Sequence, residues 1–131
     1  MLAVSTDPRR SRGELGERLA ERHLLAAGFV VVERNFRTRY GELDLVADDS
    51  RALVFCEVKT RTEGSRGGPA SPLEAVGPDK RRRLRLMAAQ WLAQRGAEAR
   101  PTPVALRFDA IGITLGPSGR LVELEHLEDA F

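Results

Sequence analysis

The stretch GELDLVADDSRALVFCEVK, residues 41–59, decides the fold of this chain of 131 residues. Residues 41–47 alternate apolar with polar side chains, which is typical of a half-buried strand. Residues 52–60 begin with an uninterrupted apolar run and are predicted to form a second strand. The acidic and serine residues at 48–50 favour a tight turn, so the two strands are predicted to form a hairpin at the centre of a sheet.

Alternation also predicts which side chains share a face of a strand. In the first strand Leu43, Leu45 and Ala47 are predicted to lie on one face. Glu42 and Asp44 are predicted to lie on the other face. One side of this strand is therefore expected to be apolar and the other acidic.

In the second strand Leu53, Phe55, Glu57 and Lys59 are predicted to share a face. Ionised groups at the end of an apolar strand are costly to desolvate unless a partner or a metal compensates them. Asp44 supplies a second carboxylate from the neighbouring strand, and two carboxylates held close repel each other. A divalent cation removes that repulsion, so we expect Mg²⁺ or Mn²⁺ between Asp44 and Glu57.

This combination suits hydrolysis of a phosphodiester bond. The reaction needs a positioned water, neutralisation of charge at the transition state and protonation of the leaving oxygen. Lys59 is expected to orient the water or to stabilise the developing negative charge. A Glu-x-Lys triplet is common, however, and a plain surface ion pair between Glu57 and Lys59 is the alternative interpretation.

Elements around the hairpin are predicted from capping residues and periodicity. A capping box at Ser11 and Glu14 begins a helix over about 11–27, and residues 29–35 form a strand that is apolar to residue 32 and then runs out to the surface. The glycines within 61–72 favour a flexible loop. The predicted later elements are a helix between Pro78 and Gly96 with Trp91 in the core, a strand over 104–115, a turn over 116–119, and a short strand or start of a helix over 120–125.

The predicted order, α-β-β-β-α-β-β, indicates an α/β fold in which helices flank a mixed central β-sheet. Residues 1–131 are expected to form a single domain, with 1–10 as a flexible N-terminal arm. No apolar run approaches the roughly 20 residues of a membrane-spanning helix, so no membrane contact and a cytoplasmic location are expected. The lone cysteine, Cys56, is expected to be a small buried hydrophobe.

Charge is distributed unevenly although the net charge is only +2. Residues 40–58 hold five acidic residues against one arginine, while 59–107 hold eleven basic residues against four acidic ones. Cations at the start of a helix oppose its macrodipole, so those at the start of the second helix need another explanation. We expect phosphate contacts from the cations in and before this helix, namely Arg61, Lys80, Arg81, Arg82 and Arg83. A merely solvated helix end is the alternative.

Three further residues are expected to be structural. His23 and His126 are too far apart in the sequence to suggest a joint role. Asp109 follows Arg107 on a late strand and is expected to be the partner of an arginine.

Several motifs together resemble the YraN family of bacterial proteins over nearly the whole chain. These motifs are Gly16-Glu17, Gly28-Phe29, Arg34-Asn35, residues 41–45, residues 53–61, residues 72–76 and Lys80. The family is similar to the PD-(D/E)XK restriction-endonuclease-like superfamily and to archaeal Holliday-junction resolvases. Leu43 stands where the superfamily name has proline, and Cys56 where relatives usually show a larger aliphatic residue. Neither difference affects the ionisable residues.

The resemblance implies a restriction-endonuclease-like fold and a metal site made by Asp44, Glu57 and the carbonyl of Val58. Lys59 is the catalytic lysine implied, and Glu17 adds an acidic group from the first helix. Glu42 is expected to support Asp44 from the same strand face.

The leading hypothesis is a Mg²⁺-dependent DNA endonuclease, with duplex or branched DNA such as a four-way junction as its substrate and a role in repair or recombination. A symmetric junction needs two symmetric cuts, so a homodimer is a further expectation. The alternatives are a non-catalytic nucleic-acid-binding module, a subunit of a DNA-repair complex, and an RNA-processing nuclease. The small number of aromatic residues disfavours recognition of single strands by base stacking.

Overall fold

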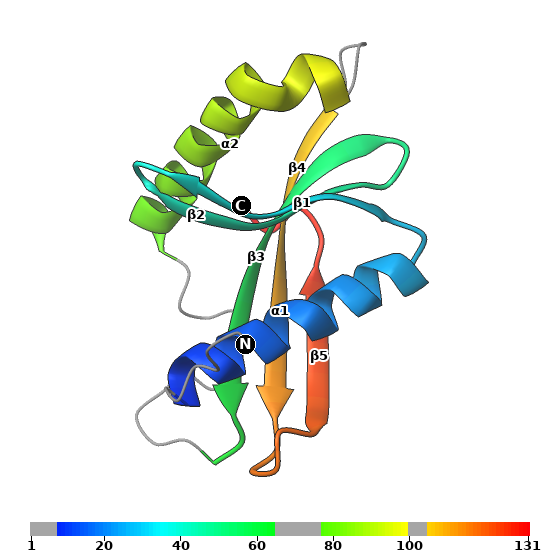
Figure 1. The fold of residues 1–131 in the computed structure, drawn as a ribbon, viewed down its shortest axis with the longest axis vertical. Coiled ribbons are helices and arrows are strands. Elements are labelled where there is room, and N and C mark those ends of the chain that lie inside the picture. Colours follow the sequence, from blue (N-terminus) through cyan, green and yellow to red (C-terminus); the bar gives the residue numbers. More distant parts are fainter. Residues whose placement is uncertain (1–7, 65–76, 100–104) are drawn as a thin grey trace, which may run out of the picture.

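The computed structural model describes residues 8–64, 77–99 and 105–131. The elements follow the predicted order α-β-β-β-α-β-β, which confirms the α/β class (Figure 1). They are α1 (Pro8–Ala26), β1 (Val30–Thr38), β2 (Gly41–Asp48), β3 (Ala52–Thr62), α2 (Pro78–Ala99), β4 (Ala105–Leu115) and β5 (Leu121–Leu127). Most of the loop predicted over 61–72 lies outside the described residues. No helix in the described ranges is both long and apolar enough to cross a membrane.

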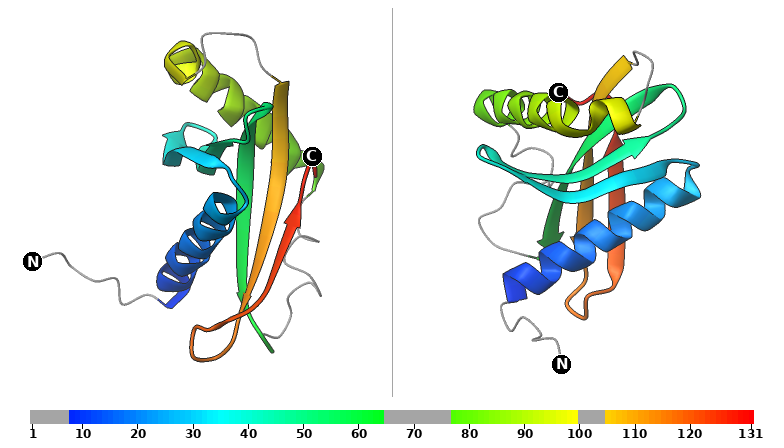
Figure 2. Two further views of the ribbon diagram at one scale, coloured as in Figure 1. Left: turned by 90° about the vertical axis from the view of Figure 1, so that its right-hand side faces the viewer. Right: turned by 45° about the horizontal axis from the view of Figure 1, so that its top comes forward.

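The sheet is mixed, as predicted, with the order β1-β2-β3-β4-β5. β3 and β4 pair in parallel, and the other neighbours pair antiparallel. Parallel neighbours need a long crossover connection, and α2 lies in the connection between β3 and β4. In the right-hand view of Figure 2 the hairpin of β1 and β2 lies between the two helices.

Two apolar clusters hold the helices against the sheet. Under α1, Ala20 and Leu24 pack with the side chains of β3 and β4 that face this helix. Under α2, Leu84 and Trp91 pack against the opposite set of side chains. Trp91 is fully buried and meets Phe55 edge to face at 5.8 Å between ring centroids, so its predicted place in the core is confirmed.

Cys56 is also buried, as predicted. Burial raises the pKa of its thiol, which therefore stays protonated at neutral pH.

The alternation predicted for β2 is wrong at Leu43. Leu43 lies in the cluster under α2, whereas Leu45 lies in the cluster under α1. Phe36 of β1, which pairs with Leu43, lies in the same cluster under α2. Next to it Asn35 has a φ of 51°, a left-handed conformation that asparagine tolerates better than most residues. A regular alternation along β2 would have placed Leu43 and Leu45 in one cluster.

Two element boundaries also differ from prediction. α1 begins at Pro8, so residues 8–10 of the predicted flexible arm are helical; proline suits the first turn of a helix because its missing N–H has no helical partner there. β1 continues to Thr38, beyond the predicted polar end at residue 35. It is an edge strand, so its polar side chains can reach solvent without ending the pairing with β2.

α1 packs closely against β3 at Gly16. A Cβ atom at this position would lie 1.8 Å from Thr60 Oγ1. We therefore expect Gly16→Ala to push the helix off the strand and to lower the free energy of unfolding by about 1–3 kcal/mol, as measured by urea denaturation. Gly13→Ala is the matched control, because a Cβ there meets nothing within 4 Å and alanine raises helix propensity by up to about 1 kcal/mol. Equal destabilisation by both changes would contradict the packing role of Gly16.

Candidate metal centre

The candidate site lies at a fork between β2 and β3. The two strands pair only where Leu45–Asp48 oppose Leu53–Cys56, and β3 then continues to Thr62 paired with β4 alone on its other side. The tip of the β1–β2 hairpin points away from the lower half of β3 (Figure 1). Asp44 is at the point of divergence, and its Oδ2 accepts a hydrogen bond of 2.8 Å from the Val58 amide. The side chain of Asp44 thus satisfies a backbone donor beyond the last β2–β3 pair.

Three carboxylates gather beside this fork. Glu17 from α1 and Glu42 and Asp44 from β2 each offer an oxygen, and these oxygens lie within 4.8 Å of one another. The side-chain nitrogen Nδ2 of Asn35 donates to Glu17 Oε2 at 3.0 Å and to Glu42 Oε1 at 2.8 Å. Glu17 was expected to add an acidic group to the site and Glu42 to support Asp44, whereas no role was predicted for the side chain of Asn35. In the structure all three form one cluster with Asp44.

Glu57 is paired with two lysines. Its side chain is 7% exposed, and its Oε1 lies 2.6 Å from Lys80 Nζ and 3.4 Å from Lys59 Nζ. The prediction that the side chains of Glu57 and Lys59 lie together is therefore confirmed. Lys80 was predicted to contact phosphates from the start of the second helix, but its ammonium lies at the carboxylate of Glu57.

Burial and repulsion together perturb the acidic groups. Burial first, and then the negative charge of Glu57, raise the pKa of Asp44 to about 8, and the hydrogen bond from Val58 opposes this change. Burial also raises the pKa of Glu17; the bond from Asn35 opposes this change and the charge of Glu42 reinforces it. Without a bound cation, Asp44 thus favours its protonated form at neutral pH.

The two lysines are shifted in opposite directions. Burial lowers the pKa of Lys59, and the neighbouring Lys80 lowers it further. Burial also acts to lower the pKa of Lys80, but its bonds to Glu57 and Lys59 and the negative charges of Glu57 and Asp44 together outweigh this effect, and the pKa is raised. Lys80 therefore holds a fixed positive charge against Glu57, whereas Lys59 releases its proton more readily than an ordinary lysine.

The donor set fits a small hard cation. Mg²⁺ and Mn²⁺ prefer oxygen ligands and are usually held by one or two carboxylates. Glu17, Glu42 and Asp44 offer such oxygens, and a cation would relieve the repulsion that raises the pKa values of Glu17 and Asp44. Glu57 is close enough to influence the charge of Asp44 but is held by its two lysines. A role for the Val58 carbonyl as a ligand stays a prediction.

The five cations predicted to bind phosphates lie in different surroundings. Arg81, Arg82 and Arg83 are exposed on α2, and Arg82 forms a surface ion pair of 2.9 Å with Asp79. Arg61 is half-buried on β3, near Lys59. The three exposed arginines can therefore reach a large polyanion, whereas Lys80 belongs to the acidic centre.

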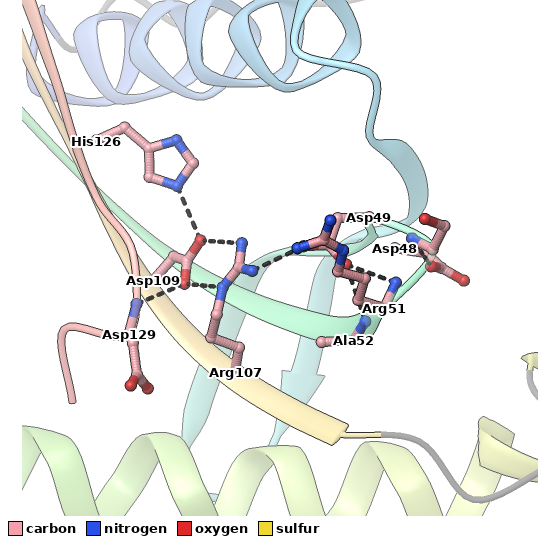
Figure 3. Close-up of polar contacts among 9 residues, drawn as sticks. Asp48, Asp49, Arg51, Ala52, Arg107, Asp109, His126 and Asp129 are labelled. Carbon is pink, nitrogen blue, oxygen red and sulfur yellow. Dashed lines mark hydrogen bonds and ion pairs between the residues drawn. The ribbon is translucent and has the colours of Figure 1, made fainter.

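A second polar network lies on the other side of β3 and joins residues from distant parts of the chain. His23 Nε2 lies 2.9 Å from His126 Nδ1, a contact that their separation in the sequence did not suggest. His126 Nε2 lies 2.8 Å from Asp109 Oδ2, and Asp109 accepts two bonds from Arg107, as the close-up in Figure 3 shows. Arg107 also donates to Asp49 at 2.7 Å. Asp109 is thus confirmed as the partner of an arginine.

Comparison with known proteins places the chain in a family. The model of uncharacterised protein family UPF0102 matches residues 16–113, a range that contains the whole acidic centre. A UPF0102 protein of Frankia alni is 48% identical over 91% of this chain and 92% of its own length. UPF0102 proteins of Rhodococcus jostii and Streptomyces griseus are each 47% identical, over 91% and 85% of this chain and over 94% and 88% of their own lengths. The family resemblance seen in the sequence motifs is therefore confirmed, and the chain belongs to uncharacterised protein family UPF0102.

Proposed function

We propose that this protein is a Mg²⁺- or Mn²⁺-dependent endonuclease that hydrolyses phosphodiester bonds in DNA. The observation that carries the proposal is the meeting of three carboxylates, from Glu17, Glu42 and Asp44, beside a glutamate held by two lysines. Oxygen ligands for a hard cation next to ammonium groups suit phosphoryl transfer, which depends on neutralising charge. The likeness of the sequence motifs to the PD-(D/E)XK superfamily supports the same activity.

Each side chain has a distinct role in this proposal. Glu17, Glu42 and Asp44 hold the cation, which when bound supplies charge neutralisation at the scissile phosphate. Lys59, whose pKa is lowered, orients the attacking water and exchanges a proton with it. Lys80 keeps its positive charge and fixes the carboxylate of Glu57, which the family resemblance implies as a further ligand of the cation.

A non-catalytic DNA-binding module is the second candidate, because the exposed arginines of α2 suit phosphate contacts with or without catalysis. Such a module needs no partly buried carboxylate with a strongly raised pKa, since this arrangement destabilises the free protein. The acidic centre therefore favours the enzyme. A four-way junction is the substrate we favour, by likeness to resolvases, and a homodimer would place two such centres on it.

The test is to incubate the pure protein with labelled duplex, flap, single-stranded and four-way DNA and with RNA, each with Mg²⁺, Mn²⁺ or EDTA. We expect cleavage of DNA with either cation and none in EDTA. Cleavage in EDTA, or cleavage that survives both Asp44→Asn and Glu57→Gln, would exclude this centre as its source. A protein that binds DNA tightly but never cleaves it would favour the binding module.

Lys80 and the exposed arginines of α2 should affect different steps. Lys80→Ala should lower kcat by about 10–100-fold, the effect of losing a supporting residue of a metal site, because Glu57 loses its shortest ion pair. Its binding of duplex DNA in Ca²⁺ should change little. The double change Arg82→Ala and Arg83→Ala should weaken binding and reduce the salt slope by about 0.9 for each lost phosphate contact. Single-turnover cleavage and fluorescence anisotropy separate the two effects, and a pure binding defect in Lys80→Ala would contradict its place in the centre.

A further inference from the structure

Two cavities meet at Gly13 on α1. One has a volume of about 500 Å³ and is lined by Arg10 and Arg37 together with the carboxylates of Glu14, Glu17 and Glu42, among others. The other has a volume of about 420 Å³ and is lined by Arg12, again by Glu17, and by residues of β3 that include Lys59 and Arg61. Gly13 lines both cavities. The first cavity thus includes the carboxylates of Glu17 and Glu42 themselves, the second shares Glu17, and each also contains arginines.

Gly13 has no packing reason to be a glycine. A Cβ atom there would meet nothing within 4 Å, in contrast to Gly16 three residues later, where a Cβ would strike Thr60. A glycine inside a helix lowers helix stability relative to alanine. What Gly13 provides is a low point on the surface of α1, because a larger side chain would rise between the two cavities.

The arginines beside Gly13 are available for a ligand on both sides. On one side Arg10 lies 3.4 Å from Glu14 and Arg37 lies 3.7 Å from Glu42, and the two arginine side chains are 69% and 87% exposed. Ion pairs this exposed contribute little and exchange readily for other anions. On the other side Arg12 Nη1 donates to Thr62 Oγ1 at 2.8 Å, which fixes the guanidinium above β3.

From this arrangement we propose that one strand of a nucleic acid crosses α1 over Gly13, with Arg10 and Arg37 binding the phosphate on one side of the cleavage point and Arg12 binding the phosphate on the other. The inference rests on the proposed function and adds the path of the substrate to it. A nucleic-acid strand carries one negative charge per nucleotide, so a cutting site needs cations on both sides of the bond that it cleaves. Glu17, which lines both cavities, lies between these two phosphate sites.

The test measures binding of a fluorescein-labelled single-stranded oligodeoxynucleotide by anisotropy in Ca²⁺, alongside thermal unfolding of each variant. Gly13→Leu should weaken binding at least tenfold while the protein melts at the same or a higher temperature. Arg37→Ala and Arg12→Ala should each weaken binding several-fold and lower the salt slope by about 0.7, the value for one phosphate contact on a single strand. Arg22→Ala is the control, because Arg22 is exposed on the same helix and lines neither of these two cavities.

The outcomes separate this inference from the nuclease proposal. Unchanged binding by Gly13→Leu, or no measurable binding by the unaltered protein, would overturn the proposed path. If Gly13→Leu also cleaves DNA normally, the nuclease stands and the path is wrong. If the predicted losses of binding occur but no DNA is cut with Mg²⁺ or Mn²⁺, the path stands and the nuclease proposal fails.

Discussion

Replacing Asp44 by asparagine should abolish DNA cleavage and should also make the metal-free protein more stable at pH 8. Loss of this carboxylate removes a ligand of the proposed cation, so the rate should fall by more than the roughly 10–100-fold that a supporting residue of a metal site costs. Asparagine keeps an oxygen that can accept the hydrogen bond from the Val58 amide. The fold should therefore survive, and cleavage is measured with Mg²⁺ on the best DNA substrate.

The gain in stability follows from the raised pKa of Asp44. This pKa rises from 3.8 to about 8 in the folded protein, chiefly by burial and then by the charge of Glu57. The folded state thus binds the proton more tightly than the unfolded state. The contribution of this proton to stability is complete below the unfolded pKa. It is lost as pH rises through the folded pKa, at about 1.4 kcal/mol for each pH unit that separates the two values.

Unfolding in EDTA between pH 4 and pH 9 provides the measurement. The free energy of unfolding of the unaltered protein should include a decrease over this range that is absent from Asp44→Asn. Glu57→Gln is the matched control: it should also lose cleavage but should become less stable, because Lys59 and Lys80 lose the carboxylate that pairs with both of them. If the free energies of unfolding of Asp44→Asn and of the unaltered protein change in parallel with pH, then folding does not raise the pKa of Asp44.

Asp109→Ala should produce the largest loss of stability among the changes considered. The carboxylate of Asp109 is fully buried and accepts two bonds from Arg107 and one from the amide of Asp129, and His126 lies 2.8 Å from it. Removing one partner of a buried ion pair costs about 3–5 kcal/mol. Arg107 would keep its bond to Asp49, but His126 and the amide of Asp129 would lose their buried partner. Urea denaturation measures the loss, and Glu123→Ala, an exposed change on the neighbouring strand β5, should stay within about 0.5 kcal/mol of the unaltered protein.

The stability of the protein at low pH should also depend on the network around Asp109. Burial alone would raise the pKa of Asp109, but its bonds with His126 and Arg107 outweigh burial and the pKa is lowered below 3.8. A depressed carboxyl pKa contributes stability that is present above the unfolded pKa and is lost as pH falls through the folded value. Asp109→Asn should therefore show less acid destabilisation below pH 4 than the unaltered protein. An equal loss of stability below pH 4 in Asp109→Asn and in the unaltered protein would contradict the role of this ion pair.

The sequence by itself determined the order of elements and the position of the central hairpin. The patterns that predict these features are local. Alternation over 41–47 and the apolar run from residue 52 each involve only residues that are close together in the chain. The pairing of Glu57 with Lys59 was predictable for the same reason, because the two residues are separated by one position in a strand. The burial of Trp91 followed from the apolar face of its own helix.

Only the tertiary structure decided which groups complete the centre. Glu17 joins Glu42 because α1 packs across the sheet and Asn35, 18 residues further on, bonds to both carboxylates. Lys80 reaches Glu57 because of where α2 begins, after a connection whose path no local pattern specifies. His23 and His126, separated by 103 positions, meet because α1 packs across the sheet over β3 and β4. Local periodicity indicates the face on which a side chain lies, whereas contacts between elements depend on where the helices are placed.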